Sequence, residues 1–263
     1  MRLLFIRHGD PNYELDALTP EGKIEAECLA KHIDYWNIDD IYLSPLGRAQ
    51  ETASYSIRAL EEQRGTKIDT VTLPWIREFN ALVDVPANNE YLNMYPNALN
   101  PDKTLRKHIV WDIVPGFLND HPEYYDSKAW KESQLAKETD LLEQYSWVVN
   151  GIDEVLASYG YVRDGMNYRV EKECTKTIAF FCHFGVTSVI LSHLMNTSPF
   201  TLLQGTIIAP TSVTEVITEE RQQGIASFRT WKMGDVSHLI MEGVEPAFSG
   251  RFCEVYSNDS QRH

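Results

Sequence analysis

The sequence predicts an α/β fold: a three-layer α/β/α sandwich built around a mostly parallel sheet. Continuous apolar runs such as residues 3–6 and 177–182 are typical of strands covered on both faces. Amphipathic segments with helical spacing follow these runs, and strands that alternate with helices favour parallel pairing. Residues 212–218 and 227–232, separated by a Gln-Gln-Gly turn, predict a hairpin-like antiparallel edge.

The first eighty residues predict three strands and two helices in alternation. We expect the strands at residues 3–6, 40–44 and 69–73. The first helix begins at Thr19 and Pro20, a favoured N-cap and a favoured first helical residue. Its apolar face is expected to comprise Ile24, Cys28, Leu29, Ile33 and Trp36. The second helix covers residues 46 to about 60, with an apolar stripe of Ala49, Ala53, Ile57 and Leu60.

Residues 84–150 interrupt this alternation before the strand at 177–182 and the apolar helix that ends near Met195. They hold five prolines and three of the six tryptophans, with 11 acidic and 6 basic residues for a net charge of −5. A stretch this long between core strands usually has a function or structure of its own. We expect one domain over residues 1–263, with a mainly helical, lid-like insertion at about 84–150 whose aromatic side chains mostly pack.

Composition and charge exclude several classes of protein. The 263 residues are 43% hydrophobic and 24% charged, which is ordinary for a globular chain and excludes intrinsic disorder. The net charge of −14 argues against binding to nucleic acid or to an anionic membrane, because both need a basic face. A small anionic substrate is still compatible with this charge, since a few local arginines outweigh the global balance.

The cysteines and the N-terminus indicate a cytoplasmic protein. No pair of the four cysteines has the spacing of metal ligands, so each is expected to be a small buried residue in a reducing compartment: Cys28, Cys174, Cys182 and Cys253. The apolar run at residues 3–6 stops at Arg7, which is too short for a signal peptide, and no stretch approaches a membrane span.

Basic side chains follow three predicted strands at the point where each strand ends. Arg7 and His8 follow the first strand, Arg48 opens the helix after the second, and His183 follows the strand at 177–182. Ligands of open α/β sheets bind beyond the carboxyl ends of the strands. A cation in the first turn of a helix opposes the helix dipole, so Arg48 indicates that an anion shares that helix terminus.

Two histidines and two arginines at one sheet edge are suited to phosphoryl transfer. Positioned cations stabilise the charge on the equatorial oxygens, and a neutral imidazole attacks phosphorus to form a covalent intermediate. A carboxyl group must then protonate the leaving oxygen. Glu78 is the best placed candidate for this role, followed by Asp10 and Asp84.

Several motifs resemble one known family when taken in order. Arg7-His8-Gly9 follows a strand, and the run Ser44-Pro45-Leu46-Gly47-Arg48-Ala49-Gln50-Glu51-Thr52-Ala53, then Arg77-Glu78 and Cys182-His183-Phe184-Gly185, come later. Together they resemble the histidine phosphatase superfamily, the phosphoglycerate-mutase-like fold, in its first branch. The resemblance covers roughly residues 1–80 and 175–235 and leaves out the insertion.

The resemblance implies a role for each residue. His8 is the nucleophile that becomes phosphohistidine, and Glu78 is the general acid and then the base. The phosphoryl oxygens are held by Arg7, Arg48, His183 and the backbone amide of Phe184. The family often has an asparagine six residues after the nucleophile; Asn12 lies two residues earlier here and is a further candidate contact. No metal and no organic cofactor are implied.

The leading hypothesis is a phosphomonoesterase that hydrolyses a small phosphorylated metabolite. A phosphoglycerate-type phosphomutase is the first alternative, although the Glu-Arg-His-Tyr-Gly run of those mutases is missing. A non-catalytic phospholigand-binding protein is the second. The insertion is expected to form a lid or wall that selects the substrate. An open edge strand would allow a homodimer, and the sequence leaves the oligomeric state open.

Overall fold

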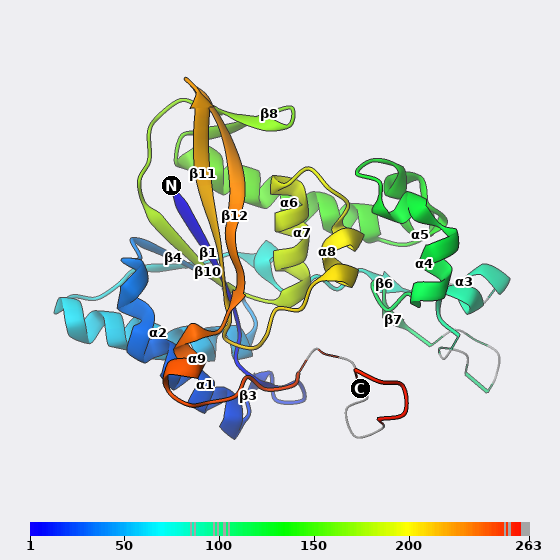
Figure 1. Ribbon diagram of the computed structural model, residues 1–263, viewed down its shortest axis with the longest axis horizontal. Coiled ribbons are helices and arrows are strands. Elements are labelled where there is room, and N and C mark those ends of the chain that lie inside the picture. The colour runs from blue at the N-terminus through cyan, green and yellow to red at the C-terminus, as the bar shows by residue number, and fades with distance from the viewer. Residues whose placement is uncertain are drawn as a thin grey trace.

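The computed structural model describes residues 1–84, 86, 88–96, 98, 100–101, 104, 106–249, 251 and 254–258. Within these ranges one large sheet has the strand order β5-β4-β10-β1-β11-β12-β9-β8 (Figure 1). The strands, in that order, span Thr70–Thr72, Asp40–Leu43, Thr177–Cys182, Arg2–Arg7, Val213–Gln222, Ile225–Asp235, Asn167–Val170 and Tyr161–Asp164. The first four run parallel, and the others extend the sheet in antiparallel pairs, which confirms the predicted fold class.

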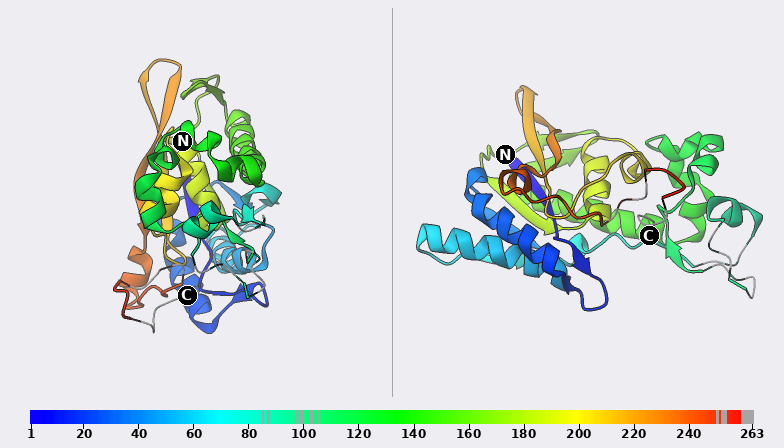
Figure 2. Two further views of the ribbon diagram at one scale, coloured as in Figure 1. Left: turned by 90° about the vertical axis from the view of Figure 1, so that its right-hand side faces the viewer. Right: turned by 60° about the horizontal axis from the view of Figure 1, so that its bottom comes forward.

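Helices cover both faces of the sheet (Figures 1 and 2). One face carries α1 (Pro20–His32), α2 (Gly47–Arg64) and the short α9 (Ser237–Met241), and the other carries α6 (Leu141–Ser158) and α7 (Phe184–Leu194). Neighbouring residues of β1 divide between two cores: Leu4 packs in the cluster that includes Leu29 of α1, whereas Leu3 packs in the cluster that includes Val189 of α7. Continuous apolar strands are therefore needed because both faces are covered.

The first helix has the predicted cap and a shifted buried face. The hydroxyl of Thr19 accepts a hydrogen bond from the Gly22 amide at 3.0 Å, and Pro20 is the first helical residue. The prediction that Ile24 lies in the core is wrong: this residue is 48% exposed, and the neighbouring Glu25 is buried. The helix turns this carboxylate inward because it accepts hydrogen bonds from the amides of Asp10 and Ala247.

The predicted hairpin is longer than expected, and further strands pair beyond it. β11 continues past the predicted end at residue 218 as far as Gln222, and β12 begins at Ile225 and continues to Asp235, so only residues 223–224 form the turn. The hairpin of β8 and β9 was not predicted, because each strand buries a single residue, Tyr161 or Tyr168, and so has too little alternation to be recognised. Two small ladders lie outside the large sheet: β2 (Pro11–Asn12) with β3 (Ala17–Leu18), and β6 (Leu82–Val83) with β7 (His108–Ile109).

The segment after β6 is largely helical where the structure describes it. It contains α3 (Asn89–Met94), α4 (Pro115–Asp120), α5 (Gln134–Glu138) and the first turns of α6, and Figure 1 shows α3, α4 and α5 beyond α8 (Pro199–Gly205), away from the sheet. Trp130 is fully buried and meets Phe200 of α8 edge to face at 6.0 Å between ring centroids. The segment thus shares the core that covers α7.

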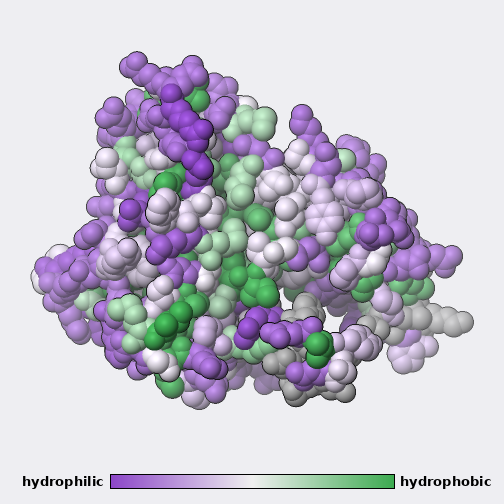
Figure 3. Space-filling model, viewed as in Figure 1, coloured by the Kyte–Doolittle hydropathy of each residue, from purple (hydrophilic) through white to green (hydrophobic). Residues whose placement is uncertain are grey.

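The described cysteines are free thiols, and most of them are buried. Cys28 and Cys182 are buried as expected, Cys174 is half-buried, all three are free thiols, and Cys253 lies outside the described residues. Within the described ranges no helix is both long and apolar enough to span a membrane, and no cluster of His, Cys, Asp or Glu is arranged to hold a metal ion. The face in Figure 3 is mostly hydrophilic. Ile240 and Met241 of α9 are exposed apolar residues.

Candidate active site

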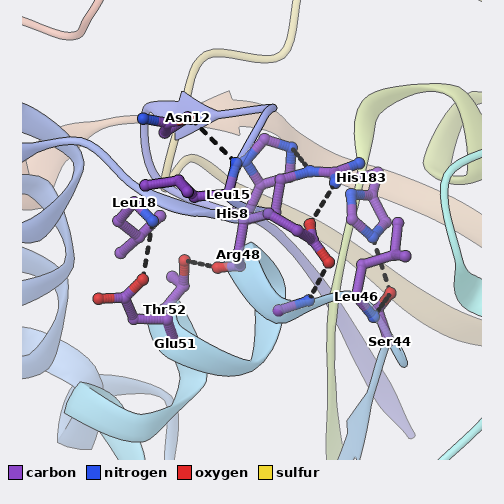
Figure 4. Close-up of polar contacts among 12 residues, drawn as sticks. His8, Asn12, Leu15, Leu18, Ser44, Leu46, Arg48, Glu51, Thr52 and His183 are labelled. Carbon is purple, nitrogen blue, oxygen red and sulfur yellow. Dashed lines mark hydrogen bonds and ion pairs between the residues drawn. The ribbon is translucent and has the colours of Figure 1, made fainter.

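Three adjacent strands bring the basic residues together. β10 lies between β1 and β4, with Arg7 opposite Cys182 and Phe181 opposite Leu43, so the three carboxyl ends are level. The four side chains are almost completely buried, with exposed fractions of 4% for Arg7, 1% for His8, 8% for Arg48 and 0% for His183. The rings of the two histidines are 5.0 Å apart between centroids, and Figure 4 shows the Arg48 guanidinium reaching toward the His8 ring.

Hydrogen bonds determine which nitrogen of His8 is free to react. Nδ1 lies 2.7 Å from the carbonyl oxygen of Gly9, and since a carbonyl only accepts, Nδ1 carries the proton. Nε2 then has a lone pair that faces the Nε–H of Arg48 at 3.3 Å. Burial, followed by the charge of Arg7, lowers the pKa of His8 well below its ordinary value, so the imidazole is neutral at neutral pH. A neutral imidazole whose Nε2 carries no proton is a competent nucleophile.

The backbone after His8 is closely packed, which explains the glycine there. A Cβ on Gly9 would lie 2.6 Å from the carbonyl oxygen of Gly22. The Gly9 amide donates to the hydroxyl of Thr52 at 3.0 Å, and that hydroxyl donates to the Arg48 carbonyl at 2.8 Å. Thr52 therefore joins the end of β1 to the helix that carries Arg48.

His183 has one satisfied and one free nitrogen. Its Nε2 lies 2.7 Å from the hydroxyl of Ser44 at the end of β4 (Figure 4). Its Nδ1 is buried and has no partner among the described residues. Burial, then the neighbouring His8, lowers the pKa of His183 well below its ordinary value. A buried polar atom without a partner needs an explanation, and a phosphoryl oxygen is a suitable one here.

Arg7 is held by backbone carbonyls from the C-terminal part of the chain. Its Nη1 donates to the carbonyl oxygens of Ile208 at 2.5 Å and Ser249 at 3.2 Å. Its Nε is buried without a partner within the described ranges. One edge of this guanidinium is therefore anchored, and an N–H remains for an anion.

Three carboxyl groups were candidates for the proton donor, and the structure separates them. Oε1 of Glu78 accepts from the amides of Gly185 at 2.9 Å and Val186 at 3.3 Å, in the first turn of α7. Burial raises the pKa of Glu78. Asp10 instead accepts from the hydroxyls of Thr19 and Ser249. Asp84 is exposed and pairs with Lys107 at 3.0 Å. Of the three, Glu78 alone contacts the helix that follows His183.

The two remaining predicted contacts have different outcomes. Phe184 is the first residue of α7, where backbone N–H groups lack partners inside the helix. The carboxamide oxygen of Asn12 accepts from the Leu15 amide at 3.1 Å, so this side chain shapes its own loop (Figure 4). The structure therefore does not bring Asn12 into contact with His8, whereas the start of α7 adjoins His183.

Sequence reasoning missed three residues that orient the site: Ser44, Thr52 and Asp16. The first two lie within the motif around Arg48, which was the available signal. Asp16 had none, since its carboxylate reaches the site through the fold: Oδ1 lies 2.6 Å from Nη1 of Arg48. Its Oδ2 accepts from the Gly47 amide at 2.6 Å, at the start of α2. The anion expected at this helix terminus is present as a side chain of the protein itself.

Comparisons with known proteins give one match to a family model. Residues 3–83 match the model of the histidine phosphatase superfamily (branch 1). No curated protein matches the sequence.

Solved structures with the same fold include a variant of the phosphoserine phosphatase of Entamoeba histolytica in complex with phosphoserine. It is 18% identical, with a TM-score of 0.54 over 90% of this chain and 98% of that chain. A mycobacterial glucosyl-3-phosphoglycerate phosphatase is 15% identical, with a TM-score of 0.51 over 88% and 97%. The alpha-ribazole phosphatase of Shigella flexneri is 18% identical, with a TM-score of 0.51 over 90% and 97%. Over residues 3–83 the chain is thus similar to the histidine phosphatase superfamily, branch 1, and it shares the fold of these solved phosphatases.

Proposed function

We propose that the protein is a phosphomonoesterase that works through a phosphohistidine on His8. The observation that carries the proposal is the state of His8: a buried neutral ring, with Nδ1–H bound to the Gly9 carbonyl and Nε2 facing the Nε–H of Arg48. The lone pair of Nε2 attacks phosphorus while the bond from phosphorus to the ester oxygen breaks. The leaving oxygen takes a proton from Glu78.

The second half of the reaction reverses the role of Glu78. The Glu78 carboxylate accepts a proton from water, the water oxygen bonds to phosphorus, and the bond from Nε2 to phosphorus breaks. Phosphate and neutral His8 result. Burial raises the pKa of Glu78, which favours the protonated form needed first, while the α7 amides stabilise the carboxylate needed second. The guanidinium groups of Arg7 and Arg48 supply the positive charge that stabilises the equatorial oxygens.

The insertion is proposed to form one wall of the substrate site. Trp111, just after β7, meets Phe184 edge to face at 6.3 Å between ring centroids. Its ring is also the nearest neighbour of a Cβ built on Gly185, with the Glu78 carboxylate next. These contacts support an apolar surface beside Glu78, the proposed proton donor, where the leaving group would lie. We therefore expect a substrate whose alcohol part has an apolar face and little charge, since the chain carries a net charge of −14.

A single experiment tests the central proposal. The wild-type protein and His8→Ala are assayed on an aryl phosphate, and the wild-type protein is quenched during turnover to trap an acid-labile, base-stable phosphoenzyme. We expect turnover and trapping in the wild-type protein and neither in the variant. Full activity of His8→Ala would defeat the proposal. Incubation with 3-phosphoglycerate and a bisphosphoglycerate primer distinguishes a mutase, which yields an isomer in place of free phosphate.

The homodimer remains a prediction. The edge strands of the large sheet are short, with β5 covering Thr70–Thr72 and β8 covering Tyr161–Asp164. Short edges limit pairing between copies. Analytical ultracentrifugation at several protein concentrations measures the oligomeric state directly.

A further inference from the structure

Asp16 forms an ion pair with Arg48, whose guanidinium group contacts the proposed nucleophile. The Nη1 of Arg48 lies 2.6 Å from Oδ1 of Asp16, and the Nε of the same guanidinium faces Nε2 of His8 at 3.3 Å. Nη1 is on the side of the planar guanidinium group away from the Nε–H. The carboxylate therefore holds one side while the N–H on the other side points at the reacting nitrogen, so the rotation of the group is determined.

The loop that carries Asp16 is itself held rigidly against α2. β2 and β3 pair on either side of it, and the Leu18 amide donates to the carboxylate of Glu51 at 2.7 Å. A Cβ on Gly47 would lie only 2.3 Å from the carbonyl oxygen of Asp16, so the helix start and the loop are in direct backbone contact. Asp16 has a φ of +48°, a conformation that Asp tolerates better than most residues.

The charge state of Asp16 is compatible with a permanent contact. Burial alone would raise its pKa, but the Gly47 amide and the Arg48 guanidinium outweigh burial and hold the pKa below its ordinary value. The Tyr13 ring, from the same loop, lies 5.4 Å from the Arg48 guanidinium carbon. The loop thus presents a carboxylate and an aromatic ring to one cation.

We propose that Asp16 is a positioning residue for phosphoryl transfer, acting through Arg48, an inference that rests on the proposed function. A long arginine side chain loses much rotamer freedom when it is ordered. The ion pair with Asp16 orders it before substrate binds, so that the Nε–H edge is already aimed at the phosphoryl group when His8 attacks. Preorganised charge of this kind acts mainly on the transition state.

The test is a double-mutant cycle of Asp16→Ala and Arg48→Ala. A misplacement of a catalytic group by about 1 Å lowers rates by up to about 100-fold, so we expect Asp16→Ala to lower kcat about 10- to 100-fold and to change KM by less than about threefold. In the Arg48→Ala background, removal of Asp16 is expected to have no further effect. Asp16→Asn, which keeps one acceptor oxygen, should recover part of the loss.

Controls separate positioning from folding. Glu14→Gln changes another acidic residue of the same loop, one that is exposed, and should leave kcat unchanged. Thermal unfolding of each variant measures the stability lost with the contact to the Gly47 amide. If Asp16 had only a structural role, Asp16→Ala would lower stability and kcat equally in the wild-type and Arg48→Ala backgrounds. An Asp16→Ala variant with wild-type kcat, or one whose loss is the same with and without Arg48, would overturn the proposal.

A second readout keeps this inference distinct from the proposed function. Orthovanadate resembles the transferring phosphoryl group, and its affinity for each variant is measured by calorimetry. We expect Asp16→Ala to weaken orthovanadate binding about 10- to 100-fold, and only when Arg48 is present. If the wild-type protein hydrolysed no phosphate ester, the proposed function would fail, and the orthovanadate cycle would still decide the role of Asp16.

Discussion

A single added methyl group at Gly185 is expected to displace the carboxylate of Glu78, the proposed proton donor. A Cβ at this position would lie 2.6 Å from the Trp111 ring and 2.8 Å from Oε1 of Glu78, where ordinary contacts begin at 3.4 Å. The carboxylate must therefore move by several tenths of an ångström, and its hydrogen bond from the Gly185 amide, at 2.9 Å, is disturbed. The Trp111 ring must shift as well, and overpacking of this kind costs about 1–3 kcal/mol, so thermal unfolding of Gly185→Ala is measured beside its activity.

The expected loss depends on the leaving group. With an alkyl phosphate, whose leaving oxygen needs a proton, we expect Gly185→Ala to lower kcat by about 100-fold, equivalent to about 2.7 kcal/mol in the barrier. With an aryl phosphate that leaves as a stable anion, the loss should be several times smaller, because proton donation contributes little. Steady-state rates over a series of leaving groups, plotted against leaving-group pKa, measure this difference.

A matched control and a clear refutation are available. Gly205 at the end of α8 has open space around its missing Cβ, so Gly205→Ala should behave like the wild-type protein in the same series. If Gly185→Ala lost activity equally for every leaving group, the effect would not act through Glu78. If it lost none, Glu78 would not be the proton donor in its observed position.

Three further predictions concern pH, the second histidine and the core. In the proposed mechanism, phosphoenzyme formation needs Glu78 protonated, and burial raises the pKa of Glu78, so the rate should fall as pH rises through that raised pKa. Glu78→Gln should abolish this decline in rapid-quench measurements of the rate against pH. A Glu78→Gln variant that kept the decline would contradict the assignment. Ser44→Ala removes the hydrogen-bond partner of His183 Nε2 and should lower the rate of phosphoenzyme formation about 10-fold in rapid-quench measurements. An unchanged rate would show that the Ser44 hydroxyl does not orient the His183 ring. Phe180→Ala removes a fully buried ring and should lower the free energy of unfolding in urea by about 3–5 kcal/mol. Val71 is 52% exposed, so Val71→Ala should change the free energy of unfolding by no more than about 0.5 kcal/mol. Equal losses in the two variants would refute the assigned core.

The strand ends illustrate how much of the site could be predicted from sequence. Apolar runs without alternation identify β1 and β10, and a histidine follows both: His183 directly, and His8 after the intervening Arg7. Because parallel strands end at the same edge of a sheet, the sequence predicts that His8 and His183 lie close together. Local pattern was sufficient because an apolar run indicates a buried strand, and helices between such runs favour parallel pairing.

Ile24 and the β8–β9 hairpin show where local pattern fails. The spacing of apolar residues in α1 included Ile24, but the helix rotates to bury the Glu25 carboxylate, whose hydrogen-bond donors come from distant parts of the chain. Burying a carboxylate is favourable only when those donors are in place. No window of sequence around residue 24 contains that information.

The sequence by itself determined the α/β class, the strand ends and the four basic residues that gather there. Only the tertiary structure decided which carboxylates lie near these four residues. The fold brings Glu78, one of three candidate proton donors, to the amide of Gly185, 107 positions away. Asp16 had no motif, and its contact with Arg48 exists because a loop from one end of β1 lies against the first turn of α2. Secondary structure follows from local periodicity, whereas a charge is assigned its partner by packing between segments that are distant in the chain.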